Sequence, residues 1–434
     1  MNDRLTLSRV VRTWWPLALS WGLMSAEPSA IAAVVARMAH PEINLAAYGS
    51  VSFAINGLIM APLISLLSLS TSITRDRATY QVGRRLMNYM GIAITIIYGL
   101  VAFTPLFDLI VKYLMGAPAE IIEPARASLM FGLPWSYAVG YRRFNQGVLI
   151  RFNHSRDVSM GTLTRFVADA LVLAIGYLTA LPTGAILATL VMVAGVNTDA
   201  LYVHFRVKKV LQQEVPAVEP GIKPVSMRSL LTLFLPLALT PLLNQLVRPI
   251  GSAALSRLPD PVTALAIWPV INSFAWLLVT PASALNETVN ALIDLPSARR
   301  PLLGFILGVM GVETAFMALL AASGFAASWF HQVSGLDAVK SQIAGHAFWL
   351  LVPLGILAPL GAWFSGAIIY SRKTRGITEG MVVYLASFTL ALTVGSAVLP
   401  VNGLYIVTGA STLSSGMQTL WLWWRSRRVL QQIQ

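Results

Sequence analysis

The sequence predicts an all-α integral membrane protein with twelve transmembrane helices, built as two parallel six-helix repeats with both termini in the cytoplasm. Of the 434 residues, 56% are hydrophobic and only 11% are charged, whereas soluble domains carry about 25% charged residues. The apolar runs reach the roughly 20 residues that a helix needs to cross a bilayer, and they lack the alternation of barrel strands. In addition, the second half of the chain repeats the first.

Twelve apolar runs, separated by short polar or basic segments, are the predicted spans. The polar and basic residues before the first run are not followed by a small-residue cleavage site, so we interpret them as a cytoplasmic tail rather than a signal peptide. The spans lie near residues 14–38, 45–72, 87–111, 127–150, 159–181, 184–206, 229–257, 262–288, 302–328, 341–370, 377–398 and 402–425.

The positive charges predict the orientation. Of the 31 Lys and Arg residues, 22 fall on segments that are cytoplasmic if the N-terminus is inside, and four lie within spans. Only five fall on the opposite side, namely Arg37, Lys112, Arg126, Arg257 and Lys340. Because cytoplasmic loops are enriched in Lys and Arg, this asymmetry supports an even number of spans, with both termini inside.

The repeat has a constant offset. PLALSWGLMSAEPSAIAAVVARMAHPEINLAA, from Pro16, aligns with PLALTPLLNQLVRPIGSAALSRLPDPVTALAI, from Pro236, at an offset of 220 residues. One residue out of that register, a proline and a glycine in the fourth span (Pro134 and Gly147) recur as Pro353 and Gly366. The chain is therefore predicted to divide into lobes at 1–209 and 229–434, joined by a polar linker at 210–228. Two parallel halves place the expected substrate path between them.

Composition and motifs exclude several functions. A net charge of +13 would suggest nucleic acid on a soluble protein, but here the basic residues sit in short loops, where they report topology and attraction to anionic lipids. There is no cysteine, and the five histidines lack metal-ligand spacing, so neither a metal nor a cofactor is expected. No phosphate-binding GxxxxGK[ST] or nucleophile–base arrangement occurs, which favours a transporter over an enzyme. We expect the transporter to be a monomer.

Charged residues within spans are the candidate functional residues, because a mid-membrane charge costs about 2.5–3.5 kcal/mol. Arg248 follows Asn244 and Gln245 and precedes a proline, and its repeat region places Glu27 before a proline. We expect Arg248, Asn244 and Gln245 to contact substrate and Glu27 to act as a gate or proton-linked group. The alternative is that Glu27 and Arg248 pair across the repeat axis and hold the lobes together.

The fourth span contains the segment GYRRFNQGVLIR, with Arg142, Arg143 and Asn145. Its repeat equivalent, PLGAWFSGAIIY, has no arginine, so the pair is specific to one half. We interpret these residues as a cationic cavity wall for anionic oxygens, which guanidinium groups bind bidentately. Alternatively, one arginine pairs with an acid on a neighbouring helix and the other extends to the interface.

Four further charges receive a gating or coupling role as a working hypothesis. Arg165 and Asp169 stand at positions i and i+4, which favours a structural salt bridge on one helix face, with gating as the alternative. Glu287 lies near the predicted cytoplasmic end of its span. Glu313 is more central and is a candidate proton site or a partner for one of the arginines.

The chain resembles the progressive ankylosis protein family, within the multidrug/oligosaccharidyl-lipid/polysaccharide (MOP) exporter superfamily that includes MATE transporters. The residues that carry the resemblance are LAAYG (45–49), RDR (75–77), GVLIR (147–151) and PLAL followed by QLVRPI (236–250). It implies export of small polyanions (pyrophosphate, nucleotide phosphates or citrate) across the plasma membrane, here a bacterial inner membrane, with Arg248 facing the substrate. A flippase for anionic lipid-linked oligosaccharides and a proton- or sodium-coupled multidrug exporter are the alternatives.

Overall fold

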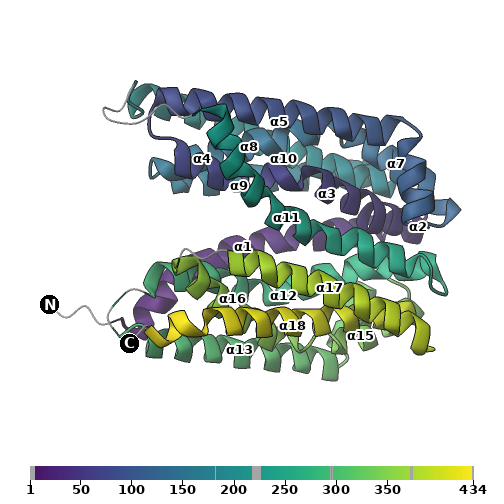
Figure 1. Cartoon of the computed structure of the whole chain (residues 1–434). Helices are drawn as coiled ribbons and strands as arrows, with labels where there is room; N and C mark the ends of the chain where they lie inside the picture. The colour runs from purple at the N-terminus through teal and green to yellow at the C-terminus, as the bar shows by residue number, and fades with distance from the viewer. Residues whose placement is uncertain are drawn as a thin grey trace. The chain divides into compact units, whose positions relative to one another are not determined.

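The computed structural model describes residues 5–180, 182–217, 226–293, 295, 297–371 and 375–432, and every regular element in these ranges is a helix (Figure 1). The chain forms two compact units. Unit 1 comprises Met1–Arg37 and Ala254–Gln434, and unit 2 comprises Met38–Ala253. Residues 218–225 of the predicted linker lie outside the described ranges.

Unit 2 is organised around α8, which packs against α4, α5 and α10 (Figure 1). Its helices are α2 (Pro41–Leu45), η1 (Ala46–Ser52), α3 (Phe53–Ile64), α4 (Leu66–Ile73), α5 (Arg77–Phe103), α6 (Leu106–Asp108), η2 (Leu109–Leu114), α7 (Ala119–Phe131), α8 (Leu133–Arg151), α9 (Ser155–Thr179), α10 (Gly184–Gln213) and most of α11 (Met227–Leu255).

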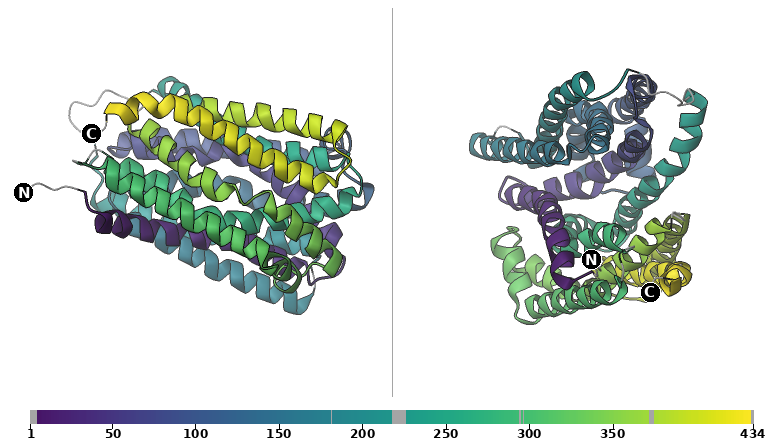
Figure 2. Two further views of the ribbon diagram at one scale, coloured as in Figure 1. Left: turned by 90° about the horizontal axis from the view of Figure 1, so that it is seen from below. Right: turned by 90° about the vertical axis from the view of Figure 1, so that its left-hand side faces the viewer.

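Unit 1 has the same plan around α16, which packs against α12, α13 and α18. Its helices are α1 (Leu7–Val35), α12 (Pro261–Leu292), α13 (Arg299–Ala322), α14 (Phe325–Gln332), α15 (Ala338–Trp349), α16 (Leu354–Tyr370), α17 (Arg375–Val398) and α18 (Gly403–Gln432). The start of α1 and the end of α18 lie at the same end of this unit (Figure 2).

The predicted repeat is confirmed by the element boundaries. Helix α1 begins at residue 7 and α11 at residue 227, a difference of 220, while α10 begins at 184 and α18 at 403, a difference of 219. His40 and Asp260, also 220 apart, both adopt a left-handed conformation, with φ of 51° and 52°. Each precedes a proline that begins a helix, and a following proline disfavours the right-handed helical conformation. The two halves therefore share local backbone geometry as well as sequence.

The paired glycines mark the same helix crossing in each unit. A Cβ on Gly147 would collide with the backbone of Leu67 and the side chain of Ser70, and a Cβ on Gly366 would meet Val289 and the carbonyl of Asn286. These contacts are related by the offset of 219 residues, because α4 and α12 occupy equivalent positions against α8 and α16. Close helix approach requires a small residue at the crossing, which explains why glycine stands in both halves.

The compact units do not coincide with the two halves of the sequence. Helix α1 packs with α12 in unit 1, where Arg37 at its end donates to the carbonyls of Val333 and Gln332. Helix α11 is assigned mainly to unit 2, where Ser252 Oγ donates to the carbonyl of Ser50 at 2.6 Å. The first helix of each half thus belongs mainly to the compact unit that holds the later spans of the other half.

The helix boundaries differ from the predicted spans where polar chemistry extends or breaks a helix. Helix α5 begins ten residues before the predicted start at residue 87, because Asp76 and Thr79 form a capping box, with Asp76 Oδ1 2.7 Å from the Thr79 N–H. The second span contains a π-helical turn, η1, in which Ser52 Oγ lies 2.9 Å from the carbonyls of both Ala47 and Ala125. Such turns interrupt the regular helix, and apolar periodicity does not reveal them.

The twelve predicted spans all correspond to helices. Among the described residues, nine helices are long and apolar enough to cross a membrane, or up to ten if the bent pair α15 and α16 forms one span. The other two predicted spans are α7 with α8, which carries arginines, and α18, which is rich in small polar residues. Each has a repeat counterpart that is long and apolar enough to cross a membrane. The counterpart of α7 with α8 is the bent pair α15 and α16, and the counterpart of α18 is α10. The protein is therefore a multi-pass, all-α membrane protein.

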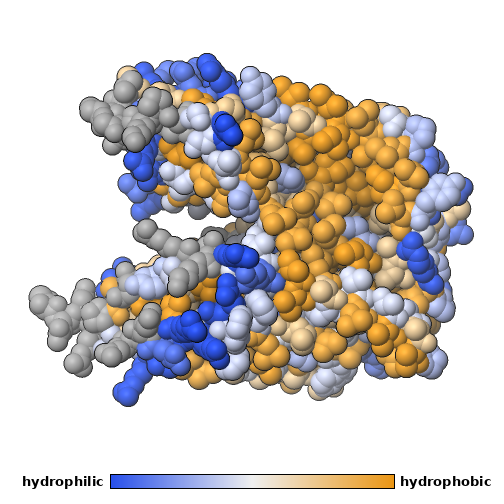
Figure 3. Space-filling view, viewed as in Figure 1, coloured by the Kyte–Doolittle hydropathy of each residue, from blue (hydrophilic) through white to orange (hydrophobic). Residues whose placement is uncertain are grey.

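The surface agrees with this assignment. Hydrophobic residues cover the middle of the visible face of each unit, and hydrophilic residues gather towards the helix ends (Figure 3). In unit 2 the exposed apolar side chains include Ile92 and Ile96 on α5 and Leu171 on α9, each more than half exposed. Such a band is the surface that a bilayer covers.

Candidate functional site

Arg248 lies on α11 of unit 2, against the start of α3. Its guanidinium is 4.8 Å from the centre of the Phe53 ring, which is the geometry of a cation–π contact. One turn earlier, the Gln245 side chain lies close to Gly57, where an added Cβ would come within 2.8 Å of the Gln245 Oε1. Among the described residues of unit 2, no carboxylate pairs with Arg248. We call Phe53, Gln245 and Arg248 the Arg248 cluster.

The neighbouring Asn244 is exposed, whereas Gln245 and Arg248 are half-buried. Helix α11 contains Pro236, Pro241 and Pro249. Each proline removes one backbone donor and leaves carbonyls without their usual helical partner. The cluster therefore sits on a continuous helix in which each proline frees a carbonyl group from its helical hydrogen bond.

Arg142 belongs to a different site, a buried ion network at the centre of unit 2. Its Nη1 is 2.8 Å from Oδ2 of Asp199 on α10, and the two side chains are 8% and 0% exposed. Gln146 Nε2 donates to the same oxygen at 3.3 Å. On α9, Arg165 Nε lies 3.5 Å from Asp169 Oδ2, the ion pair that the i, i+4 spacing favoured.

The two aspartates fit between α9 and α10 because each faces a glycine on the other helix. A Cβ on Gly161 would meet Oδ1 of Asp199, and a Cβ on Gly195 would meet the carboxylate of Asp169. The absence of a side chain at these two positions lets the helices approach and gives each carboxylate its space. The network is thus built into the helix packing of unit 2.

Asp199 is the residue that sequence reasoning missed. It was absent from the predicted intramembrane charges, although VNTDALYVHFR places it inside the sixth span. An aspartate inside the sixth span was the feature of the sequence that could have indicated a partner for Arg142 on a neighbouring helix. The structure agrees with the alternative in which one arginine of the pair is neutralised by a neighbouring acid. A substrate-binding role for Arg142 stays a prediction.

The other two predicted site residues of the fourth span contact residues of their own helix. Arg143 is half-buried and donates to Gln146 Oε1 at 3.5 Å. Asn145 is buried, and its Nδ2 donates to the carbonyl of Tyr141 on the same helix at 2.9 Å. Of the two adjacent arginines, Arg143 is therefore the one with more remaining donor capacity. It is not part of the Arg248 cluster.

The three predicted glutamates lie in unit 1. Glu27 is buried in α1, and its pairing with Arg248 stays a prediction. Glu287 is exposed on α12 and accepts from Trp21 Nε1 at 3.3 Å. Glu313 is 6% exposed on α13 and lines an apolar cavity of about 900 Å³ with Trp14 and Phe305. Among the described residues, no donor lies within hydrogen-bond geometry of either Glu313 carboxyl oxygen.

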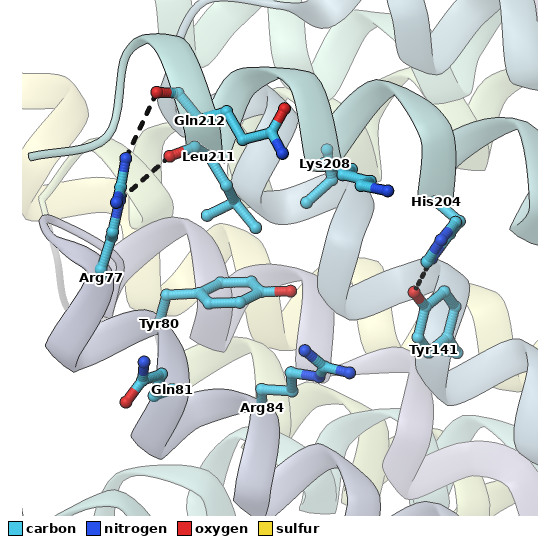
Figure 4. A pocket seen from close by; sticks show the side chains of 10 residues that line it. Arg77, Tyr80, Gln81, Arg84, Tyr141, His204, Lys208, Leu211 and Gln212 are labelled. Atoms are coloured by element: carbon cyan, nitrogen blue, oxygen red, sulfur yellow. Dashed lines mark hydrogen bonds between the residues drawn. The ribbon is translucent and has the colours of Figure 1, made fainter. Parts of the chain in front are cut away.

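Metal binding has no support in the described ranges, where no group of three or more His, Asp or Glu side chains is placed to hold an ion. A second cavity in unit 2 is basic. It lies between the first turns of α5 and the last turns of α10 and holds about 450 Å³ (Figure 4).

Comparison with known proteins establishes the class of fold. No protein-family model matches the sequence, and no curated protein matches it. Several solved structures, however, match the fold of this chain. An inward-facing multidrug resistance MATE family transporter of the MOP superfamily is similar over 96% of this chain and 99% of its own, with a TM-score of 0.76 and 14% identity.

Two further neighbours extend the comparison. One is a MOP superfamily transporter from Pyrococcus furiosus, described as having a binding pocket of reverse polarity that suggests a different function. The match covers 98% of this chain and 97% of that chain, with a TM-score of 0.71 and 16% identity. The lipid II flippase MurJ, in an inward closed conformation, covers 94% (89% of its own) with a TM-score of 0.61 and 14% identity. The chain therefore has the fold of MOP superfamily transporters, and the narrower resemblance to the progressive ankylosis family stays a prediction.

Proposed function

We propose that this chain is an alternating-access membrane transporter that exports small polyanions, with pyrophosphate, nucleotide phosphates and citrate as candidates. The observation that carries the proposal is Arg248, a cation within a span that rests on an aromatic ring and has no carboxylate partner in the described part of unit 2. A charge in a membrane span costs about 2.5–3.5 kcal/mol. An anionic ligand would supply a counter-charge for Arg248.

The geometry of the Arg248 cluster suits this role. Phe53 contacts the face of the guanidinium, which leaves its N–H edge to form paired hydrogen bonds with carboxylate or phosphate oxygens. Gln245 adds an amide donor one turn away, and Asn244 is exposed beside it. The description of a MOP transporter with a pocket of reverse polarity supports an anionic substrate, because it means that the fold is not tied to one pocket polarity.

The driving force and the coupling groups complete the proposal. Moving one charge through 100 mV is worth about 2.3 kcal/mol, so an inside-negative bacterial inner membrane drives anions outward without a coupled ion. Glu27, Glu287, Glu313 and the Arg165–Asp169 pair are assigned to gating or coupling. Arg143 and Asn145 are secondary contacts on the anion path, and the working unit is a monomer.

The test is uptake of labelled pyrophosphate, ATP or citrate into inside-out proteoliposomes under an imposed potential. Wild type should accumulate at least one of these anions, and Arg248→Ala should lower the initial rate at least about tenfold, because a charged hydrogen bond contributes about 1.5–3 kcal/mol. Arg85→Ala, which removes an exposed arginine from α5, is the matched control and should leave uptake unchanged. Absence of anion flux in wild type would reject the proposal.

Two alternative functions are each supported by a separate observation. The apolar cavity around Glu313 is suited to a lipophilic cation, so a multidrug exporter predicts uptake of a dye such as ethidium that is abolished by Glu313→Gln and unaffected by Arg248→Ala. Similarity to the lipid II flippase favours a lipid-linked substrate. In that case, a fluorescent polyprenyl-pyrophosphate sugar in the same liposomes would change leaflet, and the soluble anions would not be transported.

A further inference from the structure

The basic cavity of unit 2 is a built polar groove. Arg77, Tyr80 and Arg84 approach it from α5, His204 and Lys208 approach it from α10, and Tyr141 of α8 closes one side. In Figure 4 the Tyr80 hydroxyl, the Arg84 guanidinium and the Lys208 side chain border the same open space. We call these six residues the basic groove.

Among the described residues that line the groove there is no carboxylate to neutralise its cations. The acid nearest in sequence to the end of α10, Glu214, accepts from His154 at 2.8 Å and is not part of the lining. The groove therefore concentrates three positive charges and a histidine around a space of about 450 Å³. This arrangement attracts anions.

One of the three cations in the groove has a structural role, and the other two are available to bind a ligand. Arg77 caps the end of α10, because its Nε lies 3.2 Å from the carbonyls of both Leu211 and Val215. Arg84 and Lys208 are exposed and form no ion pair with any described residue. They come from different helices and face the same space (Figure 4).

Neutral donors complete the groove. The Tyr141 hydroxyl and His204 Nδ1 are 2.5 Å apart, which fixes the imidazole ring at the rim. Tyr80 is buried at 8% exposure, and its hydroxyl points into the groove beside Arg84 (Figure 4). A guanidinium, an ammonium and a phenol around one space match the oxygens of a phosphate group, which accept several charge-assisted hydrogen bonds at once.

The surface beside the groove is apolar. Leu201 and Phe205 on α10 are 58% and 62% exposed, and they share a helix face with His204 and Lys208. Lys208 lies seven residues beyond Leu201, or about 10 Å along the helix. The groove therefore lies where a lipid-covered face meets the polar end of the helix, at the depth of lipid head groups.

We propose that the basic groove binds a phosphate-bearing group, through Arg84, Lys208 and Tyr80, at a site separate from the Arg248 cluster. Its position next to an exposed apolar face favours the head group of an anionic phospholipid, and basic pockets between membrane helices bind such head groups. A free phosphate anion shares the same chemistry. The proposal does not rest on the transport function proposed above.

The chain provides a closely matched control for the test. Arg84 and Lys208 are each followed by a residue of the same type, Arg85 and Lys209, which are exposed and do not line the groove. The groove variant Arg84→Gln with Lys208→Gln and the control variant Arg85→Gln with Lys209→Gln therefore lose the same charge from the same helix turns. Equal elution volumes and helical circular dichroism check that both variants fold.

Binding is measured on the full chain in nanodiscs of neutral phosphatidylcholine, by native mass spectrometry, with phosphatidylglycerol in one arm and inorganic phosphate in the other. We expect wild type and the control variant to bind phosphatidylglycerol equally and the groove variant to bind at least about tenfold more weakly, given the strength of charged hydrogen bonds. The same pattern with inorganic phosphate alone would assign the groove to a soluble anion. Equal losses in both variants, or no loss in the groove variant, would overturn the proposal.

Discussion

The Arg142–Asp199 pair gives the most direct test of how unit 2 is held together. The perturbation is Asp199→Asn, which keeps the side-chain shape and removes the charge that faces Arg142 at 2.8 Å. Both side chains are nearly inaccessible, so water cannot replace the lost partner. Arg143 lies within electrostatic reach of Arg142, Arg165 and Asp199, and it therefore belongs to the same network.

The magnitude follows from this geometry. Two unit charges about 4 Å apart attract by about 4 kcal/mol at an effective dielectric constant of 20, and removing one partner of a buried pair costs about 3–5 kcal/mol. The network holds three arginines and two aspartates, a balance of +1 that becomes +2 in Asp199→Asn and 0 in Arg142→Met. We therefore expect Asp199→Asn to lose at least about 3 kcal/mol and Arg142→Met to lose less.

The assay is reversible unfolding of the purified protein by SDS titration in mixed micelles, followed by helical circular dichroism. The double variant Arg142→Met with Asp199→Leu completes a mutant cycle. It should be more stable than Asp199→Asn alone, because replacing a buried ion pair with apolar groups is often neutral.

The reasoning would be refuted by a stability of Asp199→Asn within about 0.5 kcal/mol of wild type, a size typical of surface substitutions. Transport separates the two roles considered for Arg142. If this arginine binds substrate, Arg142→Met loses transport while Asp199→Asn keeps wild-type substrate affinity in the folded fraction. If it is structural, both variants lose transport in proportion to their folded fraction.

Three further predictions concern the packing and caps. Gly195→Ala should lower the unfolding free energy by about 1–3 kcal/mol through overlap with the Asp169 carboxylate, whereas Gly99→Ala, whose added Cβ meets Leu133 at an ordinary 3.8 Å, should not destabilise in the same titration. Trp14→Phe should cost about 1 kcal/mol, because the ring contact with Phe305 is kept and the 2.9 Å bond from Nε1 to the Pro281 carbonyl is lost; an unchanged transition would contradict it. Asp337 caps α15. Desolvation raises the pKa of its carboxyl, but the hydrogen bonds and charge of Lys340, together with the Val339 N–H, more than offset this and lower it. Asp337→Ala should therefore cost about 1 kcal/mol at pH 7, and this difference should shrink as pH falls through the lowered pKa; a pH-independent difference would be the opposing result.

The basic residues show both the reach and the limit of sequence reasoning. The periodic features of the chain, namely its apolar runs, its 220-residue offset and its basic loops, predicted the membrane class and the repeat. The role of each arginine depends on which groups surround it in three dimensions. Arg77 caps α10 from 134 residues away, and Arg142 meets an acid 57 residues away. Neither sequence separation corresponds to the spacing of neighbours on one helix, so helical periodicity could not predict these contacts.

The sequence by itself determined that this protein is an all-α membrane protein made of two related halves, because length, hydropathy and internal identity are properties of the chain alone. The tertiary structure decided which helices share a compact unit, since α1 packs with α12 while the Gln245 and Arg248 side chains of α11 lie against α3. It also decided that Arg142 is neutralised while Arg248 lies on an aromatic ring. The physical reason is that a span must be apolar wherever it lies, whereas the partner of a buried charge is set by side-chain contacts between helices far apart in the chain.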